Sequence, residues 1–376
     1  MEVYLDNAAT TQVCPEAAEA AIKIMTENYG NPSSTHTKGR DAKAALDKAR
    51  KQVANALGCN HAEVYFTSCG SEGDNWAIIR GAESMKRFGS HVISSSVEHD
   101  AVRKSMDELE RLGFEVTRLE PEKDGSVSVE KVKNALRPDT VLISLMMVNN
   151  ETGAITDIAA IAKMLKAAKS KALLHSDAVQ GFMKVPFKAK TLGADLITIS
   201  GHKIHAPKGI GALYIKTGVK IKPYIMGGAQ ENALRAGTEA MPQIAAFGVA
   251  CEKAAKGMKE YTEKMISLRE LAIKTLTESM PEAIIIGGGS PHILSLSLPG
   301  WRSEVLMNFL EAKGVYVSRS SACKKGGRSH VLEAIGLSAP VIDGAIRVSF
   351  SRYTTEDDIA AFCLALKEAH DGLAHR

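Results

Sequence analysis

The stretch that decides the fold runs from Ala194 to Gly209 and reads ADLITISGHKIHAPKG. Its first six residues form an apolar run that predicts a buried strand, and Lys203 follows the strand end between two histidines. A lysine that forms a Schiff base with a carbonyl cofactor needs a rigid strand end and a poorly solvated, cation-rich environment that lowers its pKa. The segment therefore predicts Lys203 as a covalent anchor, although a lone lysine more often only closes a strand into a loop.

A second strand end supplies an acidic partner for this lysine. Residues 172–180 read ALLHSDAVQ, which predicts a buried strand that ends at Asp177 and is followed by Gln180. Ligands bind at the carboxyl ends of parallel strands, and a carboxylate there can keep a pyridinium nitrogen protonated. Asp177 and Lys203 are the pair that pyridoxal phosphate requires, although a plain buried ion pair would look similar in one sequence.

A turn rich in small residues offers a phosphate site. The predicted strand at residues 63–67 is followed by SCGSEGDN at residues 68–75 and by a helix-like segment at residues 76–82. Small residues there let backbone amides approach an anion at a helix N-terminus. The spacing matches neither the Walker pattern nor the dinucleotide fingerprint. Taken alone, the turn is equally well interpreted as an ordinary capped strand-to-helix connection.

With these residues in place, the chain resembles the pyridoxal-phosphate enzymes of the class V aminotransferase family, and within it the cysteine desulfurases of the NifS and IscS type. The resemblance extends nearly from end to end. It is carried by YLDNAATT at 4–11, GNPSS at 30–34, EH at 98–99, VNNETG at 148–153, RAGT at 235–238 and AIRVS at 345–349. It implies an α/β protein with the PLP-dependent transferase fold type I, in which helices cover a mainly parallel seven-stranded sheet and a smaller α+β domain is attached.

The resemblance also implies roles around the cofactor ring. Lys203 would bond to the cofactor aldehyde, and Asp177 would pair with the pyridine nitrogen. Gln180 would donate to the ring hydroxyl, and the imidazole of His99 would stack on the cofactor face and serve as a proton donor or acceptor. Taken singly, His99 could equally cap the helix that follows it.

Further residues are implied for the phosphate and the substrate. The residues that would hold the phosphate are Gly70, Ser71, Ser200 and His202. Thr238 would reach the phosphate of the neighbouring subunit in a homodimer. Asn150 and Arg347 would orient the substrate carboxylate, the arginine through a planar fork of two donors. As an isolated residue, Arg347 could instead lie on a surface strand.

A nucleophilic thiol distinguishes a desulfurase from its transaminating relatives. Of the six cysteines, Cys323 lies in a polar, strongly basic loop, which reads VSRSSACKKGGRSH at residues 317–330. Nearby cations favour the thiolate, and a mobile loop lets the sulfur travel. The family usually has Ser-Ser-Gly-Ser-Ala before this cysteine, whereas residues 318–322 here read SRSSA, and the stretch after it is shorter than in the long-loop IscS type. These departures bear on how far the loop can reach and on which acceptor receives the sulfur, more than on the identity of the nucleophile.

The resemblance thus implies a cysteine desulfurase that converts L-cysteine to L-alanine and forms a persulfide on Cys323. The acceptor would be a protein such as an iron-sulfur scaffold or a tRNA-thiolation enzyme. One alternative is a selenocysteine lyase or another class V aminotransferase, in which the Cys323 loop is incidental or specialised for selenium. Another is a non-catalytic sulfur-relay or scaffold protein that keeps only the fold.

The amino-acid composition is compatible with this interpretation but does not by itself indicate it. The 376 residues are 45% hydrophobic and 24% charged, as in globular proteins, and the net charge of +4 gives no nucleic-acid footprint. No apolar stretch reaches membrane-spanning length, so we expect no membrane contact. His202 and His205 have no further ligands at the spacing of a zinc site, so we expect no metal. Without a charged and apolar leader or paired cysteines, we expect the chain in the cytoplasm.

The order of predicted elements indicates two domains. Strands and helices alternate through the middle of the chain, and near residue 256 the pattern changes to one long amphipathic helix at residues 260–279. We therefore expect a large PLP-binding domain at residues 15–256. The small domain, with the Cys323 loop, would comprise residues 1–14 and 257–376.

Overall fold

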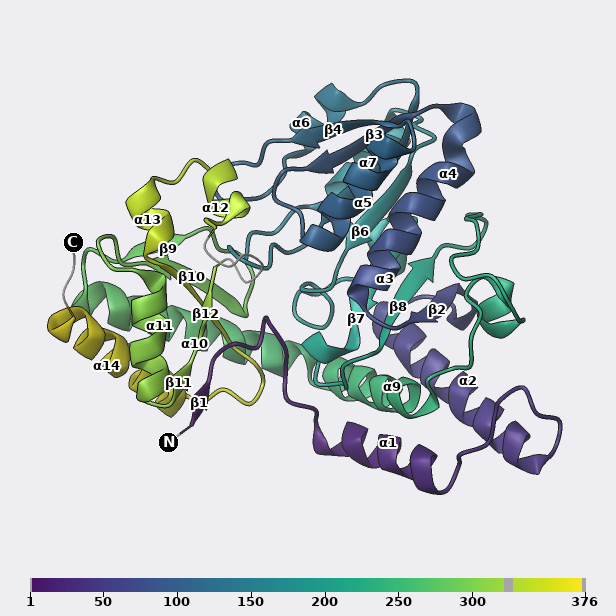
Figure 1. Cartoon of the computed structure of the whole chain (residues 1–376), viewed down its shortest axis with the longest axis horizontal. Coiled ribbons are helices and arrows are strands. Elements are labelled where there is room, and N and C mark those ends of the chain that lie inside the picture. Colours follow the sequence, from purple (N-terminus) through teal and green to yellow (C-terminus); the bar gives the residue numbers. More distant parts are fainter. Residues whose placement is uncertain (1, 321–326, 374–376) are drawn as a thin grey trace.

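The computed structural model describes residues 2–320 and 327–373, so the predicted nucleophile Cys323 lies outside the described residues. Figure 1 shows two lobes, of which the larger is built on a seven-stranded sheet and the smaller on a four-stranded sheet. The first strand lies in the smaller lobe, whereas the first helix lies in the larger one. The N-terminal segment therefore runs between the two lobes.

The large sheet has the strand order β2-β8-β7-β6-β5-β3-β4. Its strands are β2 (Val64–Thr67), β3 (His91–Ser95), β4 (Glu115–Leu119), β5 (Thr140–Met146), β6 (Leu173–Asp177), β7 (Leu196–Ser200) and β8 (Gly211–Ile215). Strand β8 runs antiparallel to both of its neighbours, β2 and β7, and the other pairs are parallel. Strands β3, β5, β6, β7 and β8 are buried along their whole length, as is typical of a sheet with helices on both faces. The predicted mainly parallel, seven-stranded sheet is confirmed.

Helices cover both faces of this sheet (Figure 1). The α-helices are α1 (Pro15–Thr26), α2 (Thr37–Leu57), α3 (Gly70–Asn75), α4 (Gly81–Met85), α5 (Asp100–Arg111), α6 (Val129–Ala135), α7 (Ile158–Ala167), α8 (Ala189–Leu192) and α9 (Met241–Lys256). The shorter helical elements are η1 (His61–Glu63), the π-helical η2 (Trp76–Arg80), η3 (Lys86–Phe88), η4 (Gly201–Lys203) and η5 (Gln230–Ala233). Helix α2 ends at Gly58, whose φ of 69° is a left-handed conformation that glycine adopts without steric cost.

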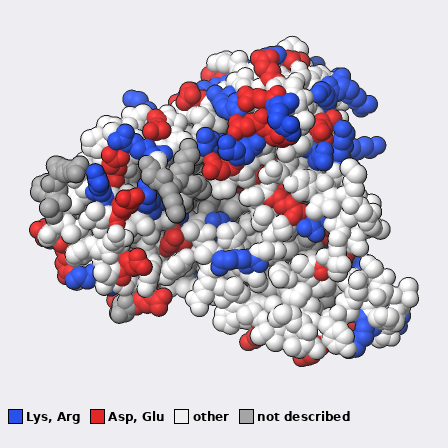
Figure 2. All heavy atoms as spheres, viewed as in Figure 1, with Lys and Arg blue, Asp and Glu red and all other residues white. Residues whose placement is uncertain are grey.

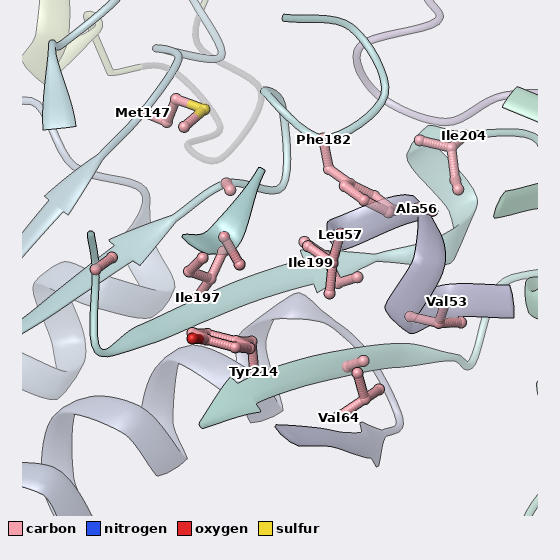
Figure 3. Close-up of a cluster of buried hydrophobic side chains, with 14 of the residues drawn as sticks. Val53, Ala56, Leu57, Val64, Met147, Phe182, Ile197, Ile199, Ile204 and Tyr214 are labelled. Carbon is pink, nitrogen blue, oxygen red and sulfur yellow. The ribbon is translucent and has the colours of Figure 1, made fainter. Parts of the chain in front are cut away.

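Two hydrophobic cores lie on opposite faces of the large sheet. Figure 3 shows the first, in which Leu57 of α2 lies near Ile197 and Ile199 of β7. On the other face, Leu196 packs in a cluster with Trp76. Successive side chains of a strand point to opposite faces, so a continuous apolar strand serves both cores.

The small lobe has a four-stranded antiparallel sheet with the order β12-β13-β10-β9. Its strands are β9 (Ile284–Ile286), β10 (Ile293–Ser297), β12 (Ser318–Arg319) and β13 (Ala345–Ser349), and the separate pair β1 (Val3–Tyr4) and β11 (Val315–Tyr316) is parallel. Its helices are α10 (Met258–Ser279), α11 (Ser303–Ala312), α12 (His330–Ala334), α13 (Ala339–Asp343) and α14 (Glu356–Gly372). Val3 and Leu5 join its core, so the first residues of the chain pack with the last third.

Charged side chains are unevenly distributed over the surface. Figure 2 shows Lys, Arg, Asp and Glu gathered at the end of the large lobe that carries α5 and β4. There Arg118 pairs with both Asp107 and Glu110. The face around α1, α2 and α9 shows fewer charges in this view. Within residues 2–320 and 327–373, no helix is both long enough and apolar enough to cross a membrane.

Leu57 provides a test of the packing between α2 and the sheet. The side chain is 0% exposed, so Leu57→Ala leaves a cavity and should lower the free energy of unfolding by about 2–5 kcal/mol. Leu364→Ala is the control, because Leu364 on α14 is 62% exposed and its loss should cost less than about 0.5 kcal/mol. Urea unfolding of both variants measures the difference, and equal midpoints would contradict the assigned packing.

Candidate active site

A cavity of about 310 Å³ opens where the carboxyl ends of the large-sheet strands face the small lobe. The predicted site residues that line it are Gly70, Ser71, His99, Asn150, Asp177, Gln180, Ser200, His202, Lys203 and Arg347. Thr238 is exposed and does not line this cavity within the chain. The structure thus brings together residues from far apart in the sequence, while their individual roles stay predictions.

Lys203 is placed by the turn that ends β7. It is the last residue of η4, directly after this buried strand. Its Nζ donates hydrogen bonds to the carbonyl oxygens of Ala8 and Ala9, at 2.6 and 2.7 Å. Burial, followed by the charge of Arg347, lowers the pKa of Lys203 to about 8. With this pKa, about a tenth of the amine is unprotonated at pH 7, far more than for an ordinary lysine, and a nucleophilic lysine requires this form.

Asp177 is the last residue of β6 and is 4% exposed. Its Oδ1 accepts a hydrogen bond from the amide of Val179 at 2.9 Å. Burial raises the pKa of Asp177, and the nearby His99 and Lys203 oppose that shift. A buried carboxylate of this kind is suited to a cationic partner, because a positive charge would remove the cost of its desolvation.

Gln180 and His99 are also fixed by hydrogen bonds at the cavity wall. The Nε2 of Gln180 donates to the carbonyl of Ala8 at 2.8 Å, and its Oε1 accepts from His292 at 3.2 Å. The Nδ1 of His99 accepts from the amide of Ala101 at 3.1 Å at the start of α5. His99 therefore caps the helix and lines the cavity at once, so the two interpretations of this residue are compatible.

The residues predicted to bind the phosphate lie where two loops approach each other closely. A Cβ atom added to Gly70 would lie 2.8 Å from Cγ2 of Val179, so only glycine fits there without a shift. The Oγ of Ser200 is buried and has no hydrogen-bond partner among the described residues. Burial, followed by the charge of Lys203, lowers the pKa of His202 to about 4, which leaves its ring neutral at pH 7. The free hydroxyl and the small-residue turn fit a phosphate group.

Arg347 points into the cavity from β13, not to the surface. Its side chain is 3% exposed, and Nη2 forms an ion pair with Oδ1 of Asp6 at 3.0 Å. Nη1 donates to the carbonyl of Asn150 at 2.8 Å, while Nε has no hydrogen-bond partner within the described part of the chain. The surface-strand interpretation of Arg347 is therefore wrong, and the guanidinium keeps one donor free.

Three buried carboxyl groups that line the cavity were not predicted from the sequence: Asp74, Glu98 and Glu151. Burial raises the pKa of Glu98 to about 8 and that of Glu151 to about 7, and it also raises the pKa of Asp74, with the charge of Asp177 adding to the shift. The Oε1 of Glu98 accepts from the hydroxyl of Ser95 and the amide of Met146. These three residues lie in sequence segments that the motifs already include, and that position is the only feature that could have identified them. The residues next to a carboxylate in the sequence do not show whether it is buried.

Comparison with known proteins places this geometry in a family. Residues 3–362 match the family described as Aminotransferase class-V. The chain belongs to the class V aminotransferases. Enzymes of this family depend on pyridoxal phosphate, and the residues around Lys203, Asp177 and Ser200 described above fit that cofactor.

The relatives of this class V aminotransferase are cysteine desulfurases of the IscS and NifS type. The chain is 43% identical over 362 residues to "Cysteine desulfurase IscS" of Methanosarcina thermophila, covering 95% of this chain and 89% of the relative. A solved structure named "NIFS-LIKE PROTEIN" aligns with a TM-score of 0.94 at 36% identity, over 99% of this chain and 100% of that one. Another, "SspA in complex with cysteine", aligns with a TM-score of 0.80 at 31% identity, over 94% and 100%. The predicted family is confirmed.

The lowered pKa of Lys203 predicts a pH dependence of its reaction with aldehydes. Because the pKa is about 8 and not 10.5, the free amine should accumulate as the pH rises through 8, and the reaction should fade below that value. Borohydride reduction of the protein with pyridoxal phosphate at several pH values, followed by peptide mapping, measures the yield at Lys203. Exposed Lys208 serves as the internal control. Equal labelling of both lysines, or a constant yield across pH, would contradict the prediction.

The close approach at Gly70 gives a second prediction. Gly70→Ala should force the loops apart, with a loss of about 1–3 kcal/mol of stability and weaker retention of pyridoxal phosphate, because the new methyl group meets Val179. Shortening that neighbour in the double variant Gly70→Ala, Val179→Ala should restore most of both quantities. Thermal unfolding and cofactor dissociation are measured for both, with Val179→Ala alone as control. A double variant no better than the single one would show that the contact is not the cause.

Proposed function

We propose that this desulfurase-type chain binds pyridoxal phosphate through Lys203, acts on L-cysteine, and transfers the sulfur to Cys323 with release of L-alanine. The observation that carries the proposal is that Lys203, Asp177 and Arg347 line one cavity. They supply an amine of lowered pKa, a buried carboxylate and a buried guanidinium. A non-catalytic scaffold would have no need to bury these three groups around one space.

The cofactor would be held by residues already described. Lys203 would form the covalent bond, Asp177 would keep the pyridine nitrogen protonated, and Gln180 and His99 would contact the ring. The residues for the phosphate would be Gly70, Ser71, Ser200 and His202, with Thr238 from a second subunit. When bound, the cofactor supplies an electron sink that stabilises negative charge at the substrate α-carbon.

The remaining steps belong to side chains of the chain itself. Arg347 has its Nε free and Asn150 beside it, so the two can orient the substrate carboxylate. The amine of Lys203, with a pKa of about 8, is suited to take a proton from the α-carbon and return it near neutral pH. His99, whose Nδ1 is occupied by the Ala101 amide, would present Nε2 as the proton donor or acceptor.

The sulfur step would use Cys323, which lies outside the described residues. Its thiolate would form a bond to the substrate sulfur as the carbon–sulfur bond breaks, and the carbon fragment would take up a proton and leave as alanine. The chain after the cysteine supports this placement, because Arg328 and His330 line the cavity. Five residues of extended chain span at most about 18 Å, so the length of chain before Arg328 allows residue 323 to reach the cavity.

The surface supports a homodimer. Thr238 is exposed, as it must be to reach a neighbouring subunit. Four apolar side chains are largely exposed. They are Ile22 (55%) and Met25 (57%) on α1, Tyr29 (68%) shortly after this helix, and Met226 (82%). Figure 2 shows few charges on the face around α1, α2 and α9. Exposed apolar side chains favour burial against a second copy.

Several finer assignments are part of the same proposal. The sulfur acceptor would be an iron-sulfur scaffold or a tRNA-thiolation enzyme, and the protein would act in the cytoplasm without contacting nucleic acid directly or a membrane. The large domain would comprise residues 15–256, and the small domain residues 1–14 and 257–376. A selenocysteine lyase or an aminotransferase is the alternative, and product analysis with cysteine, selenocysteine and a keto acid acceptor separates them.

The test of the proposal replaces the nucleophile. Cys323→Ala should abolish alanine release from L-cysteine while leaving the cofactor absorbance intact, because the sulfur acceptor is lost and Lys203 is not. The matched control is Cys59→Ala, since Cys59 lies after α2 and away from the cavity, and it should keep full turnover. Unchanged turnover in Cys323→Ala would refute the role of this residue, whereas a colourless wild-type protein would refute the cofactor assignment.

A further inference from the structure

A second, much smaller cavity lies where the two lobes meet behind η4. Its volume is about 20 Å³. The residues that line it are Met183, Lys184, Ile204, His205, Ala254, Tyr261, Met265, Ser351 and Arg352. Lys184 and His205 come from loops of the large lobe, Tyr261 comes from α10, and Arg352 follows β13 in the small lobe. Nothing in the proposed reaction uses these side chains.

Two buried cations face this cavity without hydrogen-bond partners. Lys184 is 4% exposed, and its Nζ has no partner among the residues that the structure describes. Arg352 is 8% exposed, and within the same residues none of its three guanidinium nitrogens has a partner. The guanidinium lies over the rings of Tyr261 and Tyr353, at 5.4 and 5.0 Å from the ring centroids. Buried charges are normally paired, because desolvating an unpaired ion costs several kcal/mol.

No neighbouring group of the described chain supplies the missing negative charge. The Nδ1 of His205 donates to the carbonyl of Gln12 at 2.8 Å, and burial with the charge of Arg352 lowers the pKa of His205 to about 3, so this ring is neutral. Glu16 feels the charge of Arg352, but it forms an ion pair with Lys253 and is 43% exposed. Lys264 adds positive charge, since its amine donates to the carbonyl of Arg352 at 2.9 Å.

We propose that this cavity binds one small monovalent anion of halide size between Lys184 and Arg352. Ser351 can contribute a donor, because its Oγ accepts from the amide of Tyr353 and keeps its own hydrogen available. The volume sets the size of the ligand: about 20 Å³ holds one particle near the size of a water molecule and excludes phosphate or sulfate. A water molecule would fit the space but would leave the guanidinium of Arg352, and the amine of Lys184 whenever it is protonated, without a negative charge.

The position of the site gives the anion a structural consequence. His205 is two residues after Lys203, and Ser351 and Arg352 directly follow the strand that carries Arg347 and the neighbouring Ser349. A bound anion would therefore fasten the loop that follows β6, which carries Lys184, to the small lobe beside the turn of Lys203. This role is independent of the chemistry proposed for Cys323.

Thermal unfolding of the holoenzyme at constant ionic strength tests the proposal. Replacing sodium gluconate by sodium chloride should raise the Tm of the wild-type protein by on the order of 2 °C, because gluconate is too large for the cavity. Lys184→Met should lose this chloride dependence. Lys190→Met, which removes an exposed lysine of the nearby α8, should keep it. A shift of equal size in both variants, or no shift in the wild type, would overturn the proposal.

X-ray diffraction provides a second test of the anion site, which does not require that Lys184→Met folds. Crystals of the wild-type holoenzyme grown in sodium bromide should show an anomalous peak between Nζ of Lys184 and the guanidinium of Arg352. Density there without an anomalous signal would identify a water molecule and would refute the anion site. A peak elsewhere only would do the same.

Discussion

The arrangement of the site depends on the hydrogen bonds between the first residues of the chain and the turn after β7. The amide and the hydroxyl of Thr11 donate to the carbonyl of His202, and the hydroxyl oxygen of Thr11 accepts from the amide of His205, so contacts that do not use the Lys203 amine hold this segment over the end of β7. The same segment reaches the small lobe, where Asp6 pairs with Arg347 and the side chain of Asn7 donates to the carbonyl of Ser349. One short segment therefore sets the position of the proposed anchor relative to the proposed carboxylate binder, which belong to different sheets.

Burial governs the charges around that contact. The pKa of Lys203 falls because the protonated amine is poorly solvated, and the pKa values of Glu98 and Asp74 rise because the same environment disfavours a carboxylate. At neutral pH, Glu98 thus holds its proton in the absence of a cationic neighbour. The cavity can accept a charged ligand because several of its own ionisable groups are kept neutral.

The compensation of buried charges also differs between the two cavities. In the larger one, Arg347 is compensated by Asp6, and its Nε has no hydrogen-bond partner in the described part of the chain. In the smaller one, Lys184 and Arg352 have no such partner among the described residues, so the charge must be supplied from outside or the amine must lose its proton. Burial lowers the pKa of Lys184 to about 7, which shows how costly the uncompensated charge is.

The local sequence pattern predicted a mainly parallel, helix-covered sheet and the pair Asp177 and Lys203, because the apolar strands that lead to these residues carry both signals. The number of strands and most other residues of the cavity wall came from the resemblance to the family. The sequence could not determine the burial of Glu98 and Glu151, the ion pair of Arg347 with Asp6, or the burial of Lys184 and Arg352 at one cavity. Those features join residues up to 341 positions apart, as in the Asp6 contact. Only the packing of the two lobes brings such groups together and removes water from them, and desolvation by neighbours distant in the chain leaves no mark in local sequence.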